Sequence, residues 1–225
     1  MNIDETYAKG KVAFMGIELA VAPGALVPRE ETELLGTVTV AELEAMSAKS
    51  PRIIDMCCGV GNLACALAVR FPSARVWGSD LTELCANLAR ENVKRLGLTE
   101  RVQITQADLF SGLADQGLEG TMDAVVSAPP YISQKRLEGD RAELLEHEPR
   151  EAFDGGPYGL SIHQRIIREG APFVRPGGLM LFEVGLGQDK QVQILFRRSG
   201  AFEDVRFGCD PEGNQRVVYA RRKAG

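Results

Sequence analysis

Residues 52–62 read RIIDMCCGVGN, and this stretch decides the fold. The run RIIDM is short and mostly apolar, as is typical of a buried strand, and a helical pattern begins at residue 62. Gly59 and Gly61 lie between the two, where glycine allows free backbone dihedral angles and a close approach of the backbone to a ligand. The stretch therefore predicts a strand, a glycine loop and a helix, the first unit of an α/β fold.

Strands and helices alternate on both sides of this unit. We expect strands at 52–56, 74–80, 101–106, 122–127, 177–184, about 202–208 and 215–221, and helices at 62–71, 82–97, 161–174 and 188–198. A hairpin over 11–21, turning at Met15-Gly16, and a helix over 29–46 precede them. This order predicts a Rossmann-like, mostly parallel seven-stranded sheet with helices on both faces. We expect an N-terminal extension over 1–48, whose hairpin and helix cover the active site, and a catalytic domain over 49–225.

Composition narrows the class of protein. A net charge of -5 over 225 residues does not favour duplex nucleic acid as a partner. The chain shows neither a basic leader nor an uninterrupted apolar span, so we expect no signal peptide and no membrane segment. The 5 cysteines then indicate a reducing, cytoplasmic setting. Cys57 and Cys58 are adjacent rather than spaced as zinc ligands are, so we expect no metal site.

Three acidic residues follow or end the first three predicted strands of the sheet. Asp55 precedes the glycine loop, Asp80 ends the second strand and Asp108 follows the third. Ligands of such sheets bind outside the carboxyl ends of the strands, and a carboxylate after the second strand can accept hydrogen bonds from ribose hydroxyls. The alternative for Asp80 is a cap for the helix at 82–97. Asp108 would accept a hydrogen bond from an adenine amino group, with Leu109 or Phe110 covering the ring.

The glycine pair and the three acids fit S-adenosylmethionine (SAM) better than NAD. A dinucleotide usually brings a fuller glycine fingerprint for its pyrophosphate. SAM has no phosphate to cradle, but it carries an ammonium and a sulfonium that carboxylates favour. The predicted cofactor is therefore SAM, with S-adenosylhomocysteine as its product.

The fourth predicted strand ends in SAPPY, residues 127–131. Proline cannot donate to a sheet ladder, so Pro129 and Pro130 must lie beyond the strand. SAPPY resembles the NPPY-type signature of amino-group methyltransferases. With LVPREETELL (26–35), EPREAFDGGPYGLSIHQRII (148–167) and RPGGLMLFEVGLGQ (175–188), the chain resembles the HemK-type protein glutamine methyltransferases, class I SAM-dependent enzymes that modify peptide release factors.

This resemblance implies roles for the matching positions. The implied cofactor-binding residues are Asp55, Cys57, Cys58, Gly59, Gly61, Asn62, Asp80, Leu81, Asp108, Leu109 and Ser127. Ala128, Pro129, Pro130 and Tyr131 would face the acceptor, with Tyr131 stacking on it or orienting it; the alternative is that Tyr131 packs this elbow against the sheet. Glu183 would contact the acceptor or position Arg29. The expected substrate-side residues are Arg29, Glu31, Thr32, Glu151 and His147, of which His147 is the candidate base, whereas His163 is expected to be structural.

The chain departs from the family at three points. Cys57 replaces a glycine of the SAM loop, and Ala128 replaces the signature's asparagine. We also expect the helical domain with which the family recognises release factors to be missing before the PRE segment. The asparagine amide grips the target nitrogen in the family, and losing such a partner should change the acceptor. From this we expect N- or O-methylation of a small-molecule acceptor, in specialised metabolism.

Four alternatives remain open at this stage. The chain could use SAM without transferring its methyl group, by cyclising or cleaving the cofactor and releasing methylthioadenosine. It could instead be a protein glutamine methyltransferase, a non-catalytic SAM-binding subunit or a nucleic-acid amino-methyltransferase. The three acids count against the binding subunit, and the acidic net charge counts against nucleic acid.

Overall fold

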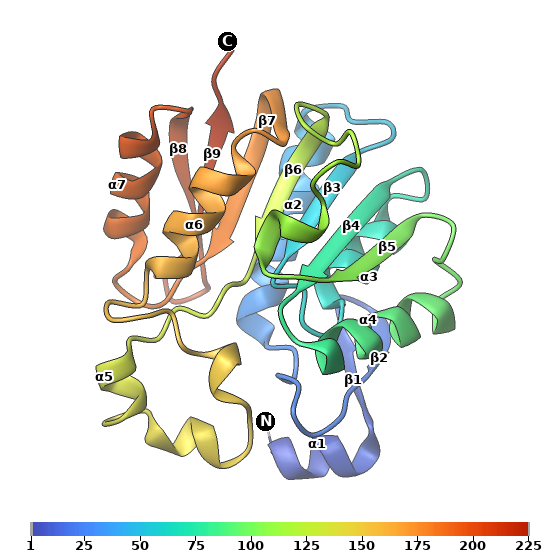
Figure 1. Ribbon diagram of the computed structural model, residues 1–225, viewed down its shortest axis with the longest axis vertical. Coiled ribbons are helices and arrows are strands. Elements are labelled where there is room, and N and C mark those ends of the chain that lie inside the picture. Colours follow the sequence, from blue (N-terminus) through green and yellow to red (C-terminus); the bar gives the residue numbers. More distant parts are fainter. Residues whose placement is uncertain (1, 225) are drawn as a thin grey trace.

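A computed structural model describes residues 2–224 of the chain (Figure 1). Seven strands form one sheet in the order β5-β4-β3-β6-β7-β9-β8. The five strands β3 to β7 run parallel, and β9 and β8 are antiparallel to their neighbours. The bounds are β3 Arg52–Met56, β4 Arg75–Asp80, β5 Val102–Gln106, β6 Met122–Ser127, β7 Val174–Glu183, β8 Phe202–Cys209 and β9 Gln215–Arg222. The predicted mostly parallel seven-stranded sheet is confirmed.

Helices cover both faces of this sheet (Figure 1). One face packs against α2 (Glu30–Ala45), α3 (Asn62–Arg70) and α4 (Glu83–Arg95). The other packs against the short helix η1 (Leu109–Gly112), α6 (Ser161–Gly170) and α7 (Asp189–Ser199). Because the core lies on both sides of the sheet, the central strands read as nearly continuous apolar runs.

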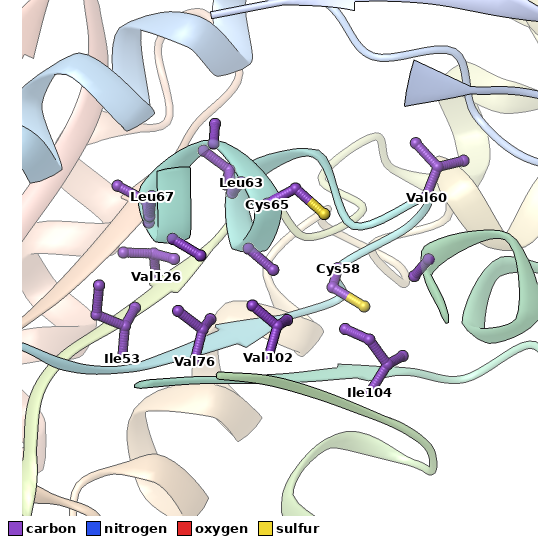
Figure 2. Packing of buried hydrophobic residues seen from close by; sticks show 14 of the residues in the cluster. Ile53, Cys58, Val60, Leu63, Cys65, Leu67, Val76, Val102, Ile104 and Val126 are labelled. Carbon is purple, nitrogen blue, oxygen red and sulfur yellow. The ribbon is translucent and has the colours of Figure 1, made fainter. Parts of the chain in front are cut away.

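Strand β3 shows how the two halves of the core arise. Successive side chains of a strand point to opposite faces, so Ile53 packs with α3 and Ile54 packs on the α6 side. Figure 2 shows Leu63 and Leu67 of α3 above Ile53, with side chains of the neighbouring strands beside it. Ile53, Ile54 and Leu67 are fully buried, and each would contribute about 1.5–3 kcal/mol by leaving water.

The largest boundary error concerns the stretch predicted as a helix over 161–174. Helix α6 ends at Gly170, where a Cβ atom would lie 2.5 Å from the ring of Phe110. Strand β7 already begins at Val174, before the predicted start at 177. Met122 of β6 pairs with Val174 of β7, whereas Ala124 pairs with Leu179, so the register between the two strands shifts at this point. The PGG turn is therefore an irregularity within the strand.

The N-terminal segment contains the predicted hairpin, formed by β1 (Lys11–Phe14) and β2 (Ile17–Ala20). Helix α1 (Ile3–Lys9) was not predicted. None of its residues is buried, so its sequence lacks the periodic apolar residues by which a helix is predicted. The charged stretch after the elbow contains three short helices that were also missed: α5 (Gln134–Leu137), η2 (Ala142–Glu146) and η3 (Arg150–Ala152). In Figure 1, α1 and this stretch lie beyond the same edge of the sheet. No helix in residues 2–224 has both the length and the apolar character needed to cross a bilayer.

Candidate active site

A cavity of about 300 Å³ opens at the carboxyl ends of the parallel strands. Ligand sites of open α/β sheets lie at this edge, and the volume is at the lower end of the range for small-molecule sites. The loops after four strands, two segments more distant in the sequence and helix α6 supply the walls. The lining includes Leu26, Cys57, Gly59, Asp80, Leu81, Asp108, Leu109, Ala128, Pro130, Glu151 and Asp154. Sequence-predicted cofactor and acceptor residues therefore meet in one space.

The glycine loop has a left-handed backbone at Cys57 (φ 60°), Gly59 (φ 53°) and Gly61 (φ 79°). This conformation suits glycine and strains most other residues, so Cys57 occupies a position that favours glycine. A Cβ atom on Gly61 would lie 3.1 Å from Cβ of Ala89, so the loop is also pressed against α4. The Gly59 N–H donates to Oδ2 of Asp80 over 2.8 Å. The loop is thus fixed to the end of the next strand.

Asp80 lies at the centre of the cofactor side. Its Oδ1 accepts from the Thr82 N–H at 3.1 Å, and burial raises the pKa of its carboxyl group. Thr82, rather than Asp80, caps α4, because its hydroxyl oxygen accepts from the Cys85 N–H. Next to Asp80, Leu81 lines the cavity with 55% of its surface exposed, which offers an apolar ledge for a flat ring.

Asp108 was predicted to accept a hydrogen bond from the adenine amino group, and it lines the cavity. Both of its carboxylate oxygens accept from the guanidinium of Arg165 on α6, at 3.0 and 3.1 Å. The next residue, Leu109, has a left-handed backbone with a φ of 50°. Its carbonyl oxygen accepts a hydrogen bond from the Ser79 hydroxyl at 2.8 Å, which fixes this backbone in place. Each carboxylate oxygen has a further lone pair, so Asp108 can still accept from a ligand.

Several predicted cofactor residues support the loop instead of lining the cavity in the described structure. Asp55 is buried, and its Oδ2 accepts from the Ala64 N–H at 2.9 Å, which joins β3 to α3. Burial raises the pKa of Asp55 to about 8, and within residues 2–224 its Oδ1 has no hydrogen-bond partner. The Ser127 hydroxyl donates to the Met56 carbonyl over 2.6 Å. Cys57 and Gly59 line the cavity, whereas Cys58, Gly61 and Asn62 are not among its lining residues in the described part of the chain.

The proline elbow forms the opposite wall of the cavity through Ala128 and Pro130. Beyond it, the Ile132 N–H donates to Phe153 O at 2.8 Å and Ile132 O accepts from the Gly155 N–H at 2.9 Å. A Cβ atom on Gly155 would lie 2.7 Å from the Pro130 carbonyl oxygen, so only glycine allows this approach. The elbow and the segment 149–155 therefore form one unit.

Tyr131 lies against the end of β7. A Cβ atom on Gly185 would lie 3.0 Å from Cδ2 of its ring, and burial, together with the charge of Glu183, raises the pKa of Tyr131. Oε2 of Glu183 also accepts from the Thr32 hydroxyl at 2.6 Å, and burial raises the pKa of Glu183. This is the packing arrangement foreseen as the alternative for Tyr131, and contact of Tyr131 or Glu183 with an acceptor stays a prediction.

Glu148 is a buried site residue that was not identified from the sequence. Its Oε1 accepts from the Val27 N–H at 2.9 Å, and its Oε2 pairs with the guanidinium of Arg29. Nothing in the sequence separates Glu148 from the other glutamates of this charged stretch, except its place in the EPRE motif. His147, the candidate base, instead has its Nδ1 3.0 Å from Oδ1 of Asp4, and both side chains are largely exposed. Glu31 is exposed on the first turn of α2.

The chain is similar to known methyltransferases in sequence and in structure. Residues 35–156 match the family model "Methyltransferase small domain". A release factor glutamine methyltransferase of Moorella thermoacetica is 36% identical over 217 residues, which is 96% of this chain and 74% of that protein. A 4-amino-L-phenylalanine/4-methylamino-L-phenylalanine methyltransferase of Streptomyces pristinaespiralis is 37% identical over 194 residues, covering 85% of this chain and 64% of that protein. A methyltransferase structure from Pyrococcus furiosus has a TM-score of 0.64 at 18% identity, over 99% and 96% of the two chains, which shows the fold alone.

These relatives contradict the expectation of a small-molecule acceptor in specialised metabolism. Release factor glutamine methyltransferases from other bacteria, including Geobacter sulfurreducens at 36% and Clostridium botulinum at 30% identity, match 96% of this chain. The expectation was wrong because it gave one side chain, Ala128, more weight than similarity over nearly the whole chain.

The expected cofactor, activity and class are confirmed together. The likeness to the glutamine methyltransferases covers 96% of this chain, and Asp80 and Asp108, which were predicted to bind the cofactor, both line the cavity. The chain belongs to the release factor glutamine methyltransferase family of SAM-dependent methyltransferases.

Proposed function

We propose that this protein methylates the side-chain amide nitrogen of a glutamine in a protein substrate, a peptide release factor. The names of the relatives at 30% to 36% identity support this acceptor. The proposal replaces the small-molecule acceptor and the cofactor-cleaving chemistry considered from the sequence.

The cavity residues fit SAM on the donor side. Asp80 would accept from the ribose hydroxyls and Asp108 from the adenine amino group, while Leu81 and Leu109 would cover the ring. There is space beside Gly59, since a Cβ atom built on this residue would have only Oδ1 of Asn62 within 4 Å, at 3.9 Å. Bound SAM supplies a methyl group that its sulfonium has already activated. The residues of this chain then have to align donor and acceptor, and alignment can contribute about 7–11 kcal/mol to lowering a barrier.

One observation carries the proposal: the elbow and the cofactor residues line the same cavity. Pro130, which lines the cavity, has a carbonyl oxygen but no N–H group, so its backbone offers a hydrogen-bond acceptor only. A glutamine amide nitrogen carries two N–H donors, which matches a wall of acceptors. The elbow therefore suits an amide NH₂ group better than a carboxylate, which could only accept.

The test is transfer of an isotopically labelled methyl group from SAM to a purified bacterial release factor. We expect labelled release factor and an equal amount of S-adenosylhomocysteine. A release factor whose target glutamine is replaced by glutamate serves as the matched control and should stay unlabelled. Formation of methylthioadenosine, or binding of SAM without any transfer to glutamine, would contradict the proposal.

Two further properties belong to this proposal. The first 48 residues would act as the extension that covers the acceptor side, because Leu26 lines the cavity and Arg29 pairs with Glu148. A reducing, cytoplasmic setting would suit the free thiols of Cys57, Cys58, Cys65, Cys85 and Cys209.

A further inference from the structure

The acceptor wall of the cavity has an unusual distribution of hydrogen-bonding groups. Ala128 lines this wall with a methyl group, which can neither donate nor accept. Pro130 beside it has no N–H group. A substrate amide held against this wall by backbone carbonyls alone would have a free side, so another group must hold the second N–H if the nitrogen is to be oriented.

Most polar side chains that line the cavity already have partners. Asp80 accepts from Gly59 and Thr82, Asp108 pairs with Arg165, and Asp154 pairs with Arg150 and accepts from the Gly156 N–H. The Ser79 hydroxyl donates to the Leu109 carbonyl, and the Thr82 hydroxyl oxygen accepts from the Cys85 N–H. These groups are fixed by the protein itself.

Glu151 is different. Among the carboxylates that line the cavity, and within residues 2–224, it is the one whose oxygens form no hydrogen bond or ion pair with the protein. It belongs to η3, directly before the residues that bond to Ile132 next to the elbow. Its backbone is therefore attached to the acceptor wall, while its carboxylate remains available to a ligand.

We propose that Glu151 determines specificity by accepting a hydrogen bond from one N–H of the substrate glutamine amide. This proposal rests on the proposed function. In the reaction, a bond forms between the amide nitrogen and the methyl carbon as the carbon–sulfur bond breaks, and the nitrogen loses one proton. The Glu151 carboxylate accepts a hydrogen bond from the N–H that carries this proton and receives the proton as the new bond forms. Glu151 is exposed, so the proton can pass on to solvent.

The proposal explains how the site tolerates alanine at position 128. An asparagine there would place an amide oxygen on the same wall. That oxygen would accept the hydrogen bond that the Glu151 carboxylate accepts in this chain. Glu151 and residue 128 should then be functionally interchangeable in part. A residue that only maintains the shape of the loop would not show this behaviour.

The test combines Glu151→Ala, Ala128→Asn and the double variant, with kcat/KM for release factor and the Kd of S-adenosylhomocysteine as readouts. Loss of a hydrogen bond to a charged group should lower kcat/KM of Glu151→Ala by about tenfold to a hundredfold. The Kd of S-adenosylhomocysteine should stay unchanged, and Ala128→Asn should restore at least part of the lost activity in the double variant. Glu146→Ala, an exposed glutamate of the same stretch outside the cavity lining, should behave as the wild type.

The outcomes separate the two proposals. A wild-type chain that binds SAM but methylates no glutamine overturns the proposed function and, with it, this inference. A wild-type chain that methylates glutamine, with Glu151→Ala equally active, overturns only the role of Glu151. Loss of activity without any rescue by Ala128→Asn also contradicts the inference, because it would mark Glu151 as a residue of the loop framework.

Discussion

Glu148 and Arg29 form an ion pair that joins two segments far apart in the sequence, each of which contributes a neighbouring residue to the lining of the cavity. The Glu148 side chain is only 2% exposed, and its second oxygen accepts from the Val27 N–H at 2.9 Å. Leu26 on one side of this pair and Pro149 on the other both line the cavity. The pair therefore fixes the N-terminal segment and the acceptor loop relative to each other.

Replacing Glu148 with alanine should destabilise the protein markedly. The change leaves the Val27 N–H and the Arg29 guanidinium without their carboxylate, and breaking a buried pair costs about 3–5 kcal/mol. Urea unfolding measures the loss. Glu44→Ala removes an exposed partner of Arg70 and should cost less than about 1 kcal/mol. Similar losses for the two variants would show that the Glu148 pair does not hold the cavity walls together.

Asp80→Asn should weaken cofactor binding. The amide keeps the size of the side chain but loses the charge with which Asp80 would accept from two ribose hydroxyls, so we expect a Kd for S-adenosylhomocysteine about tenfold higher or more. Titration calorimetry gives the constants. Asp123→Asn is the control, because Asp123 pairs with Arg175 and accepts from Arg52 at the other end of the sheet. An unchanged Kd in Asp80→Asn would place the ribose elsewhere.

Gly61→Ala should be more costly than the same change at Gly10. Both glycines have a left-handed backbone, with φ 79° and 66°, where an alanine costs about 1–2 kcal/mol. A Cβ atom on Gly61 would also meet Ala89, whereas one on Gly10 would have nothing within 4 Å. Thermal unfolding of the two variants isolates this contact. Equal losses would show that the glycine loop has room to move away from α4.

His163 should make the protein less stable in acid. Its Nε2 donates to the Glu183 carbonyl at 3.1 Å, and complete burial lowers its pKa from 6.5 to about 4. Between these two values the unfolded chain binds a proton that the folded chain does not, so stability falls as the pH is lowered through this window. His163→Gln cannot titrate there and should lose less stability between about pH 7 and about pH 5 in urea unfolding. Equal slopes would contradict a neutral, buried histidine.

The sheet and the cofactor side could be predicted because they follow from local patterns. Alternating apolar strands and helices predicted the mostly parallel sheet, and Asp80 and Asp108 end or follow strands whose carboxyl ends must meet at one edge. The burial of Asp55, by contrast, depends on how α3 packs over β3, which no local pattern shows.

The acceptor side could not be predicted in the same way. The orientation of Tyr131 depends on Glu183 and Gly185, more than fifty residues away in the sequence. The pairing of Glu148 with Arg29 spans 119 residues. Ala128 was read alone, without the segment 149–155 that is bonded to the same elbow, and this led to the wrong acceptor. Long-range contacts of this kind become visible only in the folded chain.

The most direct test of the account is tandem mass spectrometry of a release factor after incubation with this protein and SAM. We predict one added methyl group, located by fragment ions on the side chain of a single glutamine, and its disappearance when that glutamine is replaced by glutamate. A release factor that remains unmodified, or a methyl group located on any other residue, would contradict the assignment of this cavity to glutamine methylation.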